Sequence, residues 1–176
     1  AKFEKSYFTG GIISNYTDYQ KRRYPELCND LIGVLNLKET DKILDVGCAT
    51  GALLWEFKKK GFGNIKGMDE SIWAITKVRE MFKLGDWIDH YNRNLYTEQK
   101  WDWIFFFDVL EHFSDDELEK VMFLLKHNPP KNGIIVRIPV AVEEGEDFVL
   151  DISKRDKTHI QVHTKKFWCD VFQMAG

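Results

Sequence analysis

Residues 42–51 read KILDVGCATG, and this stretch decides the fold of the chain. Its first half is short and rich in branched apolar residues, and Gly47 follows it directly, which predicts a buried β-strand that ends in a tight turn. Residues 50–60 then carry leucines and a phenylalanine at helical spacing. A strand, a glycine-containing loop and a helix in this order form the first unit of an α/β fold.

The same alternation continues on both sides of this stretch. A helix is expected from about Pro25, and further strands are expected at 65–68, weakly within 87–95, at 103–109 and at 133–139. Further helices are expected over 71–83, after a capping box that begins at Ser114, and from Thr164 onward, with a polar loop over 140–163. The pattern predicts a Rossmann-like, doubly wound, mostly parallel sheet in three α/β/α layers.

Ligands of such sheets bind beyond the carboxyl ends of the strands, so the residues after each strand carry the information about function. The spacing Gly47-x-x-x-Gly51 differs from the G-x-G-x-x-G of dinucleotide-binding loops. Asp45 would also repel a pyrophosphate, whereas it suits a ligand that carries an ammonium and a sulfonium. Asp69 follows the second strand, where a carboxylate can accept two hydrogen bonds from a ribose.

These residues resemble the class I S-adenosylmethionine-dependent methyltransferases. Residues 43–54 (ILDVGCATGALL) are similar to their first motif, and residues 67–71 (GMDES) to the acid that ends their second strand. Residues 101–113 (WDWIFFFDVLEHF) resemble the fourth-strand motif of the small-molecule branch that includes ubiquinone-biosynthesis methyltransferases, and residues 158–176 resemble the end of that branch's domain. The resemblance predicts a methyltransferase domain over 25–176, preceded by an aromatic arm or lid over 1–24.

The resemblance also implies the cofactor S-adenosylmethionine, the product S-adenosylhomocysteine and a set of binding residues. It places Asp45, Gly47 and Gly51 at the methionine end, Asp69 at the ribose and Asp108 near the amino-acid part. The full predicted cofactor-binding set is Asp45, Gly47, Cys48, Ala49, Gly51, Asp69, Glu70, Asn94 and Asp108, with Tyr16 and Arg23 from the arm.

The chain departs from the family's pattern at three points. Ala49 stands where glycine is common, and Asn94 takes the place where an acid often lies near the adenine. The antiparallel strand pair that ends the family fold is expected to be missing, through truncation or an untraced tail.

Candidate catalytic residues follow from the chemistry of methyl transfer. A base helps when the acceptor is a hydroxyl, and His112, four residues past Asp108, is the best-placed imidazole. His159 and His163 on the late loop are weaker candidates. Their spacing is that of two metal ligands, but no third ligand is evident, so no metal site is predicted.

Composition limits the classes of partner. The formal net charge of -3 over 176 residues argues against nucleic acid and anionic membranes. Three cysteines without a C-x-x-C pair, and a start without a signal-peptide core, predict a cytoplasmic protein. A small-molecule substrate methylated at oxygen or nitrogen is expected. The alternatives are a protein or nucleic-acid methyltransferase and a non-catalytic cofactor-binding subunit. The substrate and the oligomeric state are not predicted.

Overall fold

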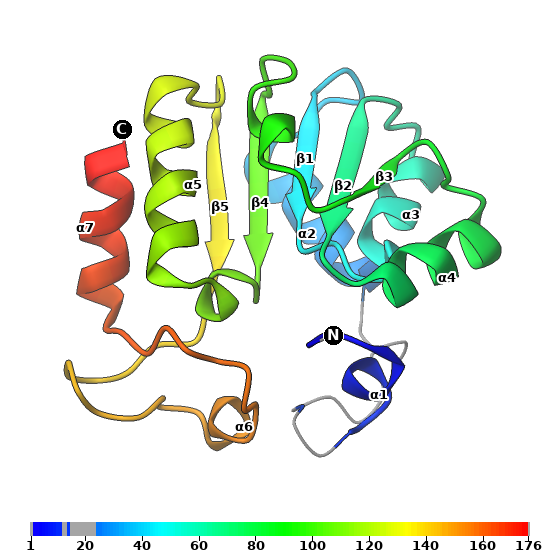
Figure 1. Cartoon of the computed structure of the whole chain (residues 1–176). Helices are drawn as coiled ribbons and strands as arrows, with labels where there is room; N and C mark the ends of the chain where they lie inside the picture. The colour runs from blue at the N-terminus through cyan, green and yellow to red at the C-terminus, as the bar shows by residue number, and fades with distance from the viewer. Residues whose placement is uncertain (1, 12–13, 15–23, 176) are drawn as a thin grey trace.

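The computed structural model describes residues 2–11, 14 and 24–175, and its centre is one parallel sheet (Figure 1). The strands run in the order β3-β2-β1-β4-β5, and every pairing between neighbours is parallel. Their bounds are β1 Ile43–Val46, β2 Ile65–Asp69, β3 Ile88–His90, β4 Trp103–Phe107 and β5 Gly133–Arg137. This arrangement confirms the predicted Rossmann-like sheet, and the described residues add no antiparallel strand beside β5.

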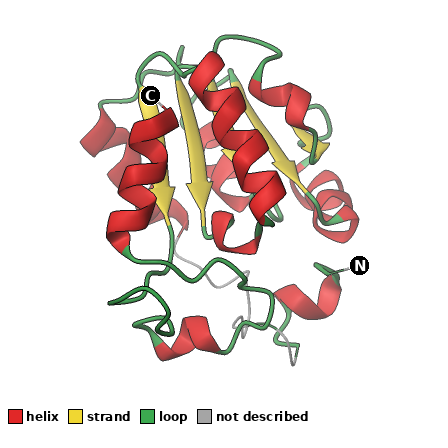
Figure 2. Cartoon of the chain, turned by 60° about the vertical axis from the view of Figure 1, so that its left-hand side comes forward, coloured by secondary structure: helices red, strands yellow, loops and turns green. Residues whose placement is uncertain are grey.

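Helices cover both faces of the sheet and complete three layers (Figure 2). The longer helices are α2 Tyr24–Leu35, α3 Ala52–Lys59, α4 Ile72–Phe82, α5 Asp115–His127 and α7 Lys165–Ala175. Two single-turn helices, α1 Lys5–Phe8 and α6 Asp151–Lys154, and two short 3₁₀ segments, η2 Arg93–Tyr96 and η3 Leu110–His112, lie in the connections. Among the described helices, none has the length and apolar character that a bilayer-spanning segment needs.

Strand β4 shows how the apolar run at 103–107 builds two cores at once. Its middle residues are fully buried, because successive side chains of a strand point to opposite faces. Phe105 packs into the core under α2, α3 and α4. Ile104 and Phe106 pack into the other core, with α5 and α7. Burial on both faces explains why the run lacks the polar alternation of a half-exposed strand.

Side-chain caps start the helices close to where the sequence predicts. Ser71 accepts a hydrogen bond from the backbone N–H of Ala74 at 3.0 Å and caps α4. Ser114 accepts from the N–H of Glu117 at 3.2 Å and caps α5. The carboxylate of Glu117, the second member of the expected capping box, instead accepts a hydrogen bond from the hydroxyl of Tyr91.

The segment 140–163 is more than the polar surface loop that the sequence predicts. It contains α6, and the side chains of Asp156, Thr158 and Gln161 are buried. The backbone N–H groups of residues 160 and 161 donate to the carbonyl of Glu111 at 2.8 and 3.0 Å. This loop therefore packs against η3 at the end of β4.

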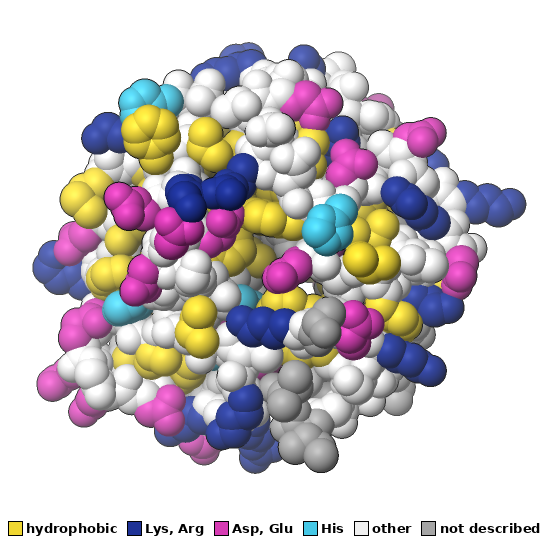
Figure 3. Space-filling model, in the orientation of Figure 1, with side chains coloured by type: hydrophobic (Ala, Val, Ile, Leu, Met, Phe, Trp, Pro, Cys, Tyr) yellow, Lys and Arg dark blue, Asp and Glu magenta, His cyan; other side chains and the backbone are white. Residues whose placement is uncertain are grey.

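Two segments far apart in the chain lie beyond the carboxyl ends of the strands. Figure 1 shows α1 and the segment around α6 beneath the arrowheads of the sheet. Strand order reverses between β1 and β4, which is where ligands of such sheets bind. On the face drawn in Figure 3, acidic and basic side chains are interspersed around this region, with no continuous basic surface.

Candidate cofactor and acceptor site

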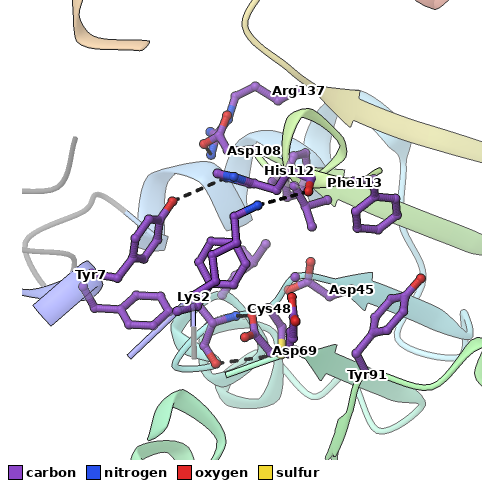
Figure 4. A pocket seen from close by; sticks show the side chains of 18 of the residues that line it. Lys2, Tyr7, Asp45, Cys48, Asp69, Tyr91, Asp108, His112, Phe113 and Arg137 are labelled. Atoms are coloured by element: carbon purple, nitrogen blue, oxygen red, sulfur yellow. Dashed lines mark hydrogen bonds and ion pairs between the residues drawn. The ribbon is translucent and has the colours of Figure 1, made fainter. Parts of the chain in front are cut away.

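A cavity of about 510 Å³ opens at the switch point of the sheet. Its volume lies in the range usual for small-molecule sites. Most of the predicted binding residues line it, as Figure 4 shows for several of them. They are Asp45, Gly47, Cys48, Ala49, Asp69, Glu70 and Asp108, and the predicted catalytic residue His112 lines the same cavity.

The loop between β1 and α3 is held against the end of β2 by its own backbone. The N–H groups of Gly47 and Cys48 donate to the carbonyl of Met68 at 2.8 and 3.1 Å. Gly47 has φ +71°, and a Cβ there would lie 2.6 Å from Cγ2 of Val109. Ala49 also has a positive φ, +49°, in the place where the family commonly has glycine. The loop is thus a strained, closely packed turn whose backbone faces the cavity.

Asp69 connects this loop to the start of α4. One of its carboxylate oxygens accepts from the N–H of Ala49 at 2.7 Å, and the other from the N–H of Ser71 at 2.8 Å. Each carboxylate oxygen has a second lone pair, so the group can still accept hydrogen bonds from a ligand. Asp69 is therefore both a loop-fixing residue and a lining residue of the cavity, which goes beyond the ribose-binding role that the sequence predicts.

Two buried carboxyl groups face the cavity without a cation that neutralises them fully. Burial, followed by the nearby charge of Asp69, raises the pKa of Asp45 to about 7, although Arg137 opposes the shift. Burial raises the pKa of Asp69 to about 6, against the lowering effect of its two backbone hydrogen bonds. A cationic ligand would favour the ionised form of both groups. The donor set therefore fits the ammonium and sulfonium groups of S-adenosylmethionine.

These shifts predict how cofactor affinity changes with pH. Because both pKa values are raised on folding, their contribution to stability is present below about pH 4 and is lost as pH rises through 6 to 7. Cofactor binding has the opposite dependence, since it needs the ionised carboxylates. We expect the affinity for S-adenosylmethionine to rise about tenfold or more between pH 5.5 and 8, measured by calorimetry. Asp45→Asn should flatten this profile, and an unchanged profile would contradict the assignment.

Asp108 directly follows β4 in a left-handed conformation, which is uncommon for residues other than glycine. Its φ is +55°. Its carboxylate forms a bidentate ion pair with Arg137 at the end of β5, at 3.1 and 2.8 Å. Both residues line the cavity, and Figure 4 shows the pair at its edge. Backbone strain of this kind concentrates at binding sites, so the pair marks the wall of the cavity beyond β4 and β5.

His112 lies on η3 with one ring nitrogen engaged by the protein. Nδ1 lies 2.9 Å from Oγ1 of Thr158 and 3.1 Å from its carbonyl oxygen. The hydroxyl of Thr158 donates to Asp156 at 2.6 Å, so the same oxygen accepts from Nδ1–H of the imidazole. This arrangement leaves the lone pair on Nε2, whose neighbour is the hydroxyl of Tyr7 at 3.4 Å. Burial, followed by the charge of His159, lowers the pKa of His112 to about 4.

Among the described residues, several other predicted ones lie away from the cavity wall. Gly51, with φ +65°, is the N-cap of α3 and is not among the lining residues. Asn94 is exposed on η2 and does not reach the cavity, because η2 turns its side chain outward; Tyr91 lines that end instead. His159 lies behind His112, with ring centroids 4.7 Å apart. Tyr16 and Arg23 lie outside the described residues.

His163 has no place in the cavity wall. Its ring stacks on Phe167 with centroids 3.7 Å apart, and Nδ1 lies 3.0 Å from the carboxylate of Glu144. The arm instead contributes residues that sequence reasoning did not select. Tyr7 and Phe8 are buried on α1, and Lys2 donates to the carbonyl of His112 at 3.3 Å.

Comparison with known proteins agrees with this geometry. Residues 16–176 match the family model described as a methyltransferase domain. The chain belongs to this family. It is therefore an enzyme of the S-adenosylmethionine-dependent methyltransferases, with S-adenosylmethionine as its cofactor. No curated protein sequence matches the chain.

Solved structures share the fold of this methyltransferase domain at low sequence identity. An S-adenosylmethionine-dependent methyltransferase from Archaeoglobus fulgidus superposes with a TM-score of 0.64 at 17% identity, over 87% of this chain and 68% of that one. A protein from Pyrococcus horikoshii OT3 gives 0.62 at 20%, over 88% and 82%. An N-methyltransferase from Haemonchus contortus, in complex with phosphomonomethylethanolamine and S-adenosylhomocysteine, gives 0.63 at 12%, over 86% and 36%.

Proposed function

We propose that this methyltransferase moves a methyl group from S-adenosylmethionine to an oxygen or nitrogen of a small molecule. The observation that carries the proposal is that one cavity holds both kinds of group the reaction needs. Buried carboxyl groups that suit a cationic cofactor line one side, and the imidazole of His112 lines the other. The volume of about 510 Å³ and the interspersed charges around the site favour a small acceptor over nucleic acid (Figure 3).

The cofactor is proposed to lie over the loop between β1 and α3. Asp69 would hold the ribose with its remaining lone pairs, and Gly47 would let the chain approach the methionine part closely. Asp45 and the pair of Asp108 with Arg137 border the amino-acid end, where both an ammonium and a carboxylate must be met. When bound, the cofactor supplies a methyl group on a sulfonium, and the C–S electron pair stays on sulfur as the bond from the acceptor to carbon forms.

His112 is proposed to act on the acceptor atom. The contacts of Nδ1 with Thr158 leave the lone pair of Nε2 free to take the proton of an acceptor hydroxyl as the new bond forms. A lone pair in this position can also bind a cation that polarises the same hydroxyl. Either way, the protein holds the acceptor close to the methyl carbon, which is the main requirement of a one-step displacement.

The arm is proposed to cover the cavity once ligands are bound. Phe8 stacks on Trp73 of α4 with centroids 5.4 Å apart, and Tyr7 donates to Asp156 at 2.9 Å. These contacts dock α1 over the cavity and bury Tyr7 and Phe8, so opening of the cover would expose both rings. The predicted cytoplasmic location is supported by the three free thiols, Cys28, Cys48 and Cys169.

Titration and a labelled-methyl assay test this function together. S-adenosylhomocysteine should bind to the chain and NAD should not. Transfer of labelled methyl groups would then be screened over small hydroxyl and amine compounds, with a protein and an RNA mixture as parallel acceptors. Tight NAD binding would refute the cofactor assignment, and transfer only to the protein or RNA mixture would refute the small-molecule proposal. Cofactor binding without transfer to any acceptor would favour a non-catalytic subunit.

Removing the carboxylate of Asp69 should weaken cofactor binding measurably. We expect Asp69→Ala to cost roughly 1–3 kcal/mol in the affinity for S-adenosylhomocysteine, because charged hydrogen bonds are lost. Thermal stability should fall as well, since two loop N–H groups lose their acceptor. Asp89→Ala is the matched control, because that acid pairs with Lys66 and does not line the cavity. Equal affinities in the two variants would remove Asp69 from the site.

A further inference from the structure

Behind His112 lies a cluster of buried polar side chains that the methyl-transfer mechanism does not use. Glu111 is fully buried, and the side chain of His159 is 4% exposed. Neither carboxylate oxygen of Glu111 has a hydrogen-bond partner, and neither does Nδ1 of His159. Nε2 of His159 lies 3.8 Å from the carboxylate of Glu111, which is too long for a hydrogen bond. The two groups face each other without making a hydrogen bond.

An unpaired buried carboxylate is costly, so its neighbours should contain something that stabilises it. A proton on Glu111 would remove the charge, but the resulting O–H would still find no acceptor within hydrogen-bond distance in this cluster. The imidazole of His159 does not pair with the carboxylate either, because its Nε2 stands 3.8 Å away and its Nδ1 has no hydrogen-bond partner. A cation between the groups would satisfy the carboxylate and the imidazole together.

We propose that Glu111, His112 and His159 bind one divalent transition-metal ion. One ligand atom from each lies within 4.8 Å of the other two. Ligands around one tetrahedral ion stand about 3.4 Å apart, so side-chain movements of about 1 Å would close the site. Two imidazoles and one carboxylate form a donor set typical of Zn²⁺, Mn²⁺ or Fe²⁺, and a poor one for Ca²⁺.

The surroundings of His112 prepare it to be a ligand. A metal-binding histidine usually donates its other ring N–H to an oxygen, which fixes the tautomer and the ring orientation. Thr158 accepts from Nδ1 here, and Asp156 in turn accepts from Thr158. The nitrogen that remains is Nε2, with its lone pair available. Asp156 also lies 3.7 Å from Nε2 of His159, which adds negative charge beside the ion.

The position of the cluster beside the cavity suits the ion to activate the acceptor, an inference that rests on the proposed function. Of the three ligands, His112 lines the cavity and Glu111 and His159 do not, so an ion bound to Nε2 of His112 would sit at the cavity wall. An ion held there would act on the acceptor through the side facing the cavity. It would bind an acceptor oxygen and lower the pKa of its hydroxyl. The proton then leaves to water, and the oxygen keeps the electron pair that forms the bond to the methyl carbon. The acceptor class is therefore a hydroxyl compound.

Metal titration of the full chain tests the site directly. The chelator-treated protein would be titrated with ZnCl₂ and with MnCl₂ by calorimetry, and with CoCl₂ while visible absorption is recorded. We expect one ion per chain, a rise in melting temperature and a cobalt spectrum. Glu111→Gln and His159→Gln should each weaken binding at least about tenfold. His127→Gln is the control, because that histidine is exposed at the end of α5 and should not change binding.

Melting temperature and cofactor titration separate a loss of the metal site from a loss of folding. Without metal, Glu111→Gln should melt at about the same temperature as the wild type, because the carboxyl group that it replaces has no hydrogen-bond partner to lose. With saturating Zn²⁺ the variant should melt at a lower temperature than the wild type. S-adenosylhomocysteine is titrated into every sample, so that loss of folding or of the cofactor site is seen separately. Stoichiometric binding lost in both variants supports the site. No binding of any of the three ions, or equal binding in Glu111→Gln, overturns it while leaving the methyltransferase proposal intact.

Discussion

His112→Ala is expected to lower turnover by about 10²–10⁴, with the affinity for S-adenosylhomocysteine close to that of the wild type. The reason is geometric. The side chain lines the cavity, and the contact of Nδ1 with Thr158 at 2.9 Å leaves Nε2 to act on the acceptor. The effect is the same in kind whether Nε2 takes the proton or binds an ion that lowers the pKa of the acceptor hydroxyl. Turnover is measured at saturating acceptor, and affinity is measured by calorimetry.

Two variants separate this expectation from a general loss of structure. His127→Ala changes an exposed histidine on α5, far from the cavity, and should keep full turnover. Thr158→Val removes the hydroxyl that orients the imidazole but keeps His112, so it should cause a smaller loss of turnover. Normal turnover in His112→Ala would rule out any chemical role for this residue. A loss that appears only in cofactor affinity would make it a binding residue.

Much of the fold is predictable because its strands are apolar on both faces. The run at 103–107 indicates a central strand by itself, since it has no polar alternation and the structure buries it between two cores. The caps Ser71 and Ser114 are equally local signals. β3 is harder, because it covers only three residues, Ile88–His90, at an edge of the sheet. Short strands of this kind carry little periodicity to read.

The residues of the site also fall into two groups: some have a signal in the local sequence, and others are placed by contacts between distant segments. Asp45, Asp69 and Asp108 lie at the carboxyl ends of strands, so the position rule for parallel sheets finds them. Arg137 ends β5 and satisfies the same rule, so its position in the sequence carries the same signal. The partners Tyr7 and Thr158 carry no such signal, because they reach His112 across 105 and 46 residues of sequence. Pairings over such distances are set by the packing of the arm and the late loop.

The cluster behind His112 shows a second limit of sequence reasoning. His159 and His163 have metal-ligand spacing, but the structure separates them, and His163 pairs with Glu144. The other two members of the cluster beside His159 come from η3, where Glu111 and His112 are adjacent in the chain. An acid in a motif gives no sign of whether it is exposed or buried. Its burial depends on the loop whose backbone donates to the carbonyl of Glu111.

Gly47→Ala is expected to lower the free energy of unfolding by about 2–5 kcal/mol, a large part of the 5–15 kcal/mol typical of a domain. Two costs add. A φ of +71° costs an L-residue roughly 1–2 kcal/mol. The new Cβ would also stand 2.6 Å from Cγ2 of Val109, and overpacking of this kind costs roughly 1–3 kcal/mol. Because the loop faces the cavity, S-adenosylhomocysteine affinity should fall too. Urea unfolding and calorimetry measure the two effects.

A double-mutant cycle separates the two costs. Val109→Ala removes the atom that the new Cβ would meet, so Gly47→Ala should cost less in that background by about 1–2 kcal/mol. The remaining cost is the positive φ, which no change at position 109 relieves. Gly33→Ala in α2 is the matched control, since a Cβ there meets nothing within 4 Å, and helix propensity predicts a gain of about 0.5–1 kcal/mol. If the unfolding free-energy changes of Gly47→Ala and Val109→Ala add strictly, the two positions do not make contact. The loop would then have room for a side chain at position 47 beside the cofactor.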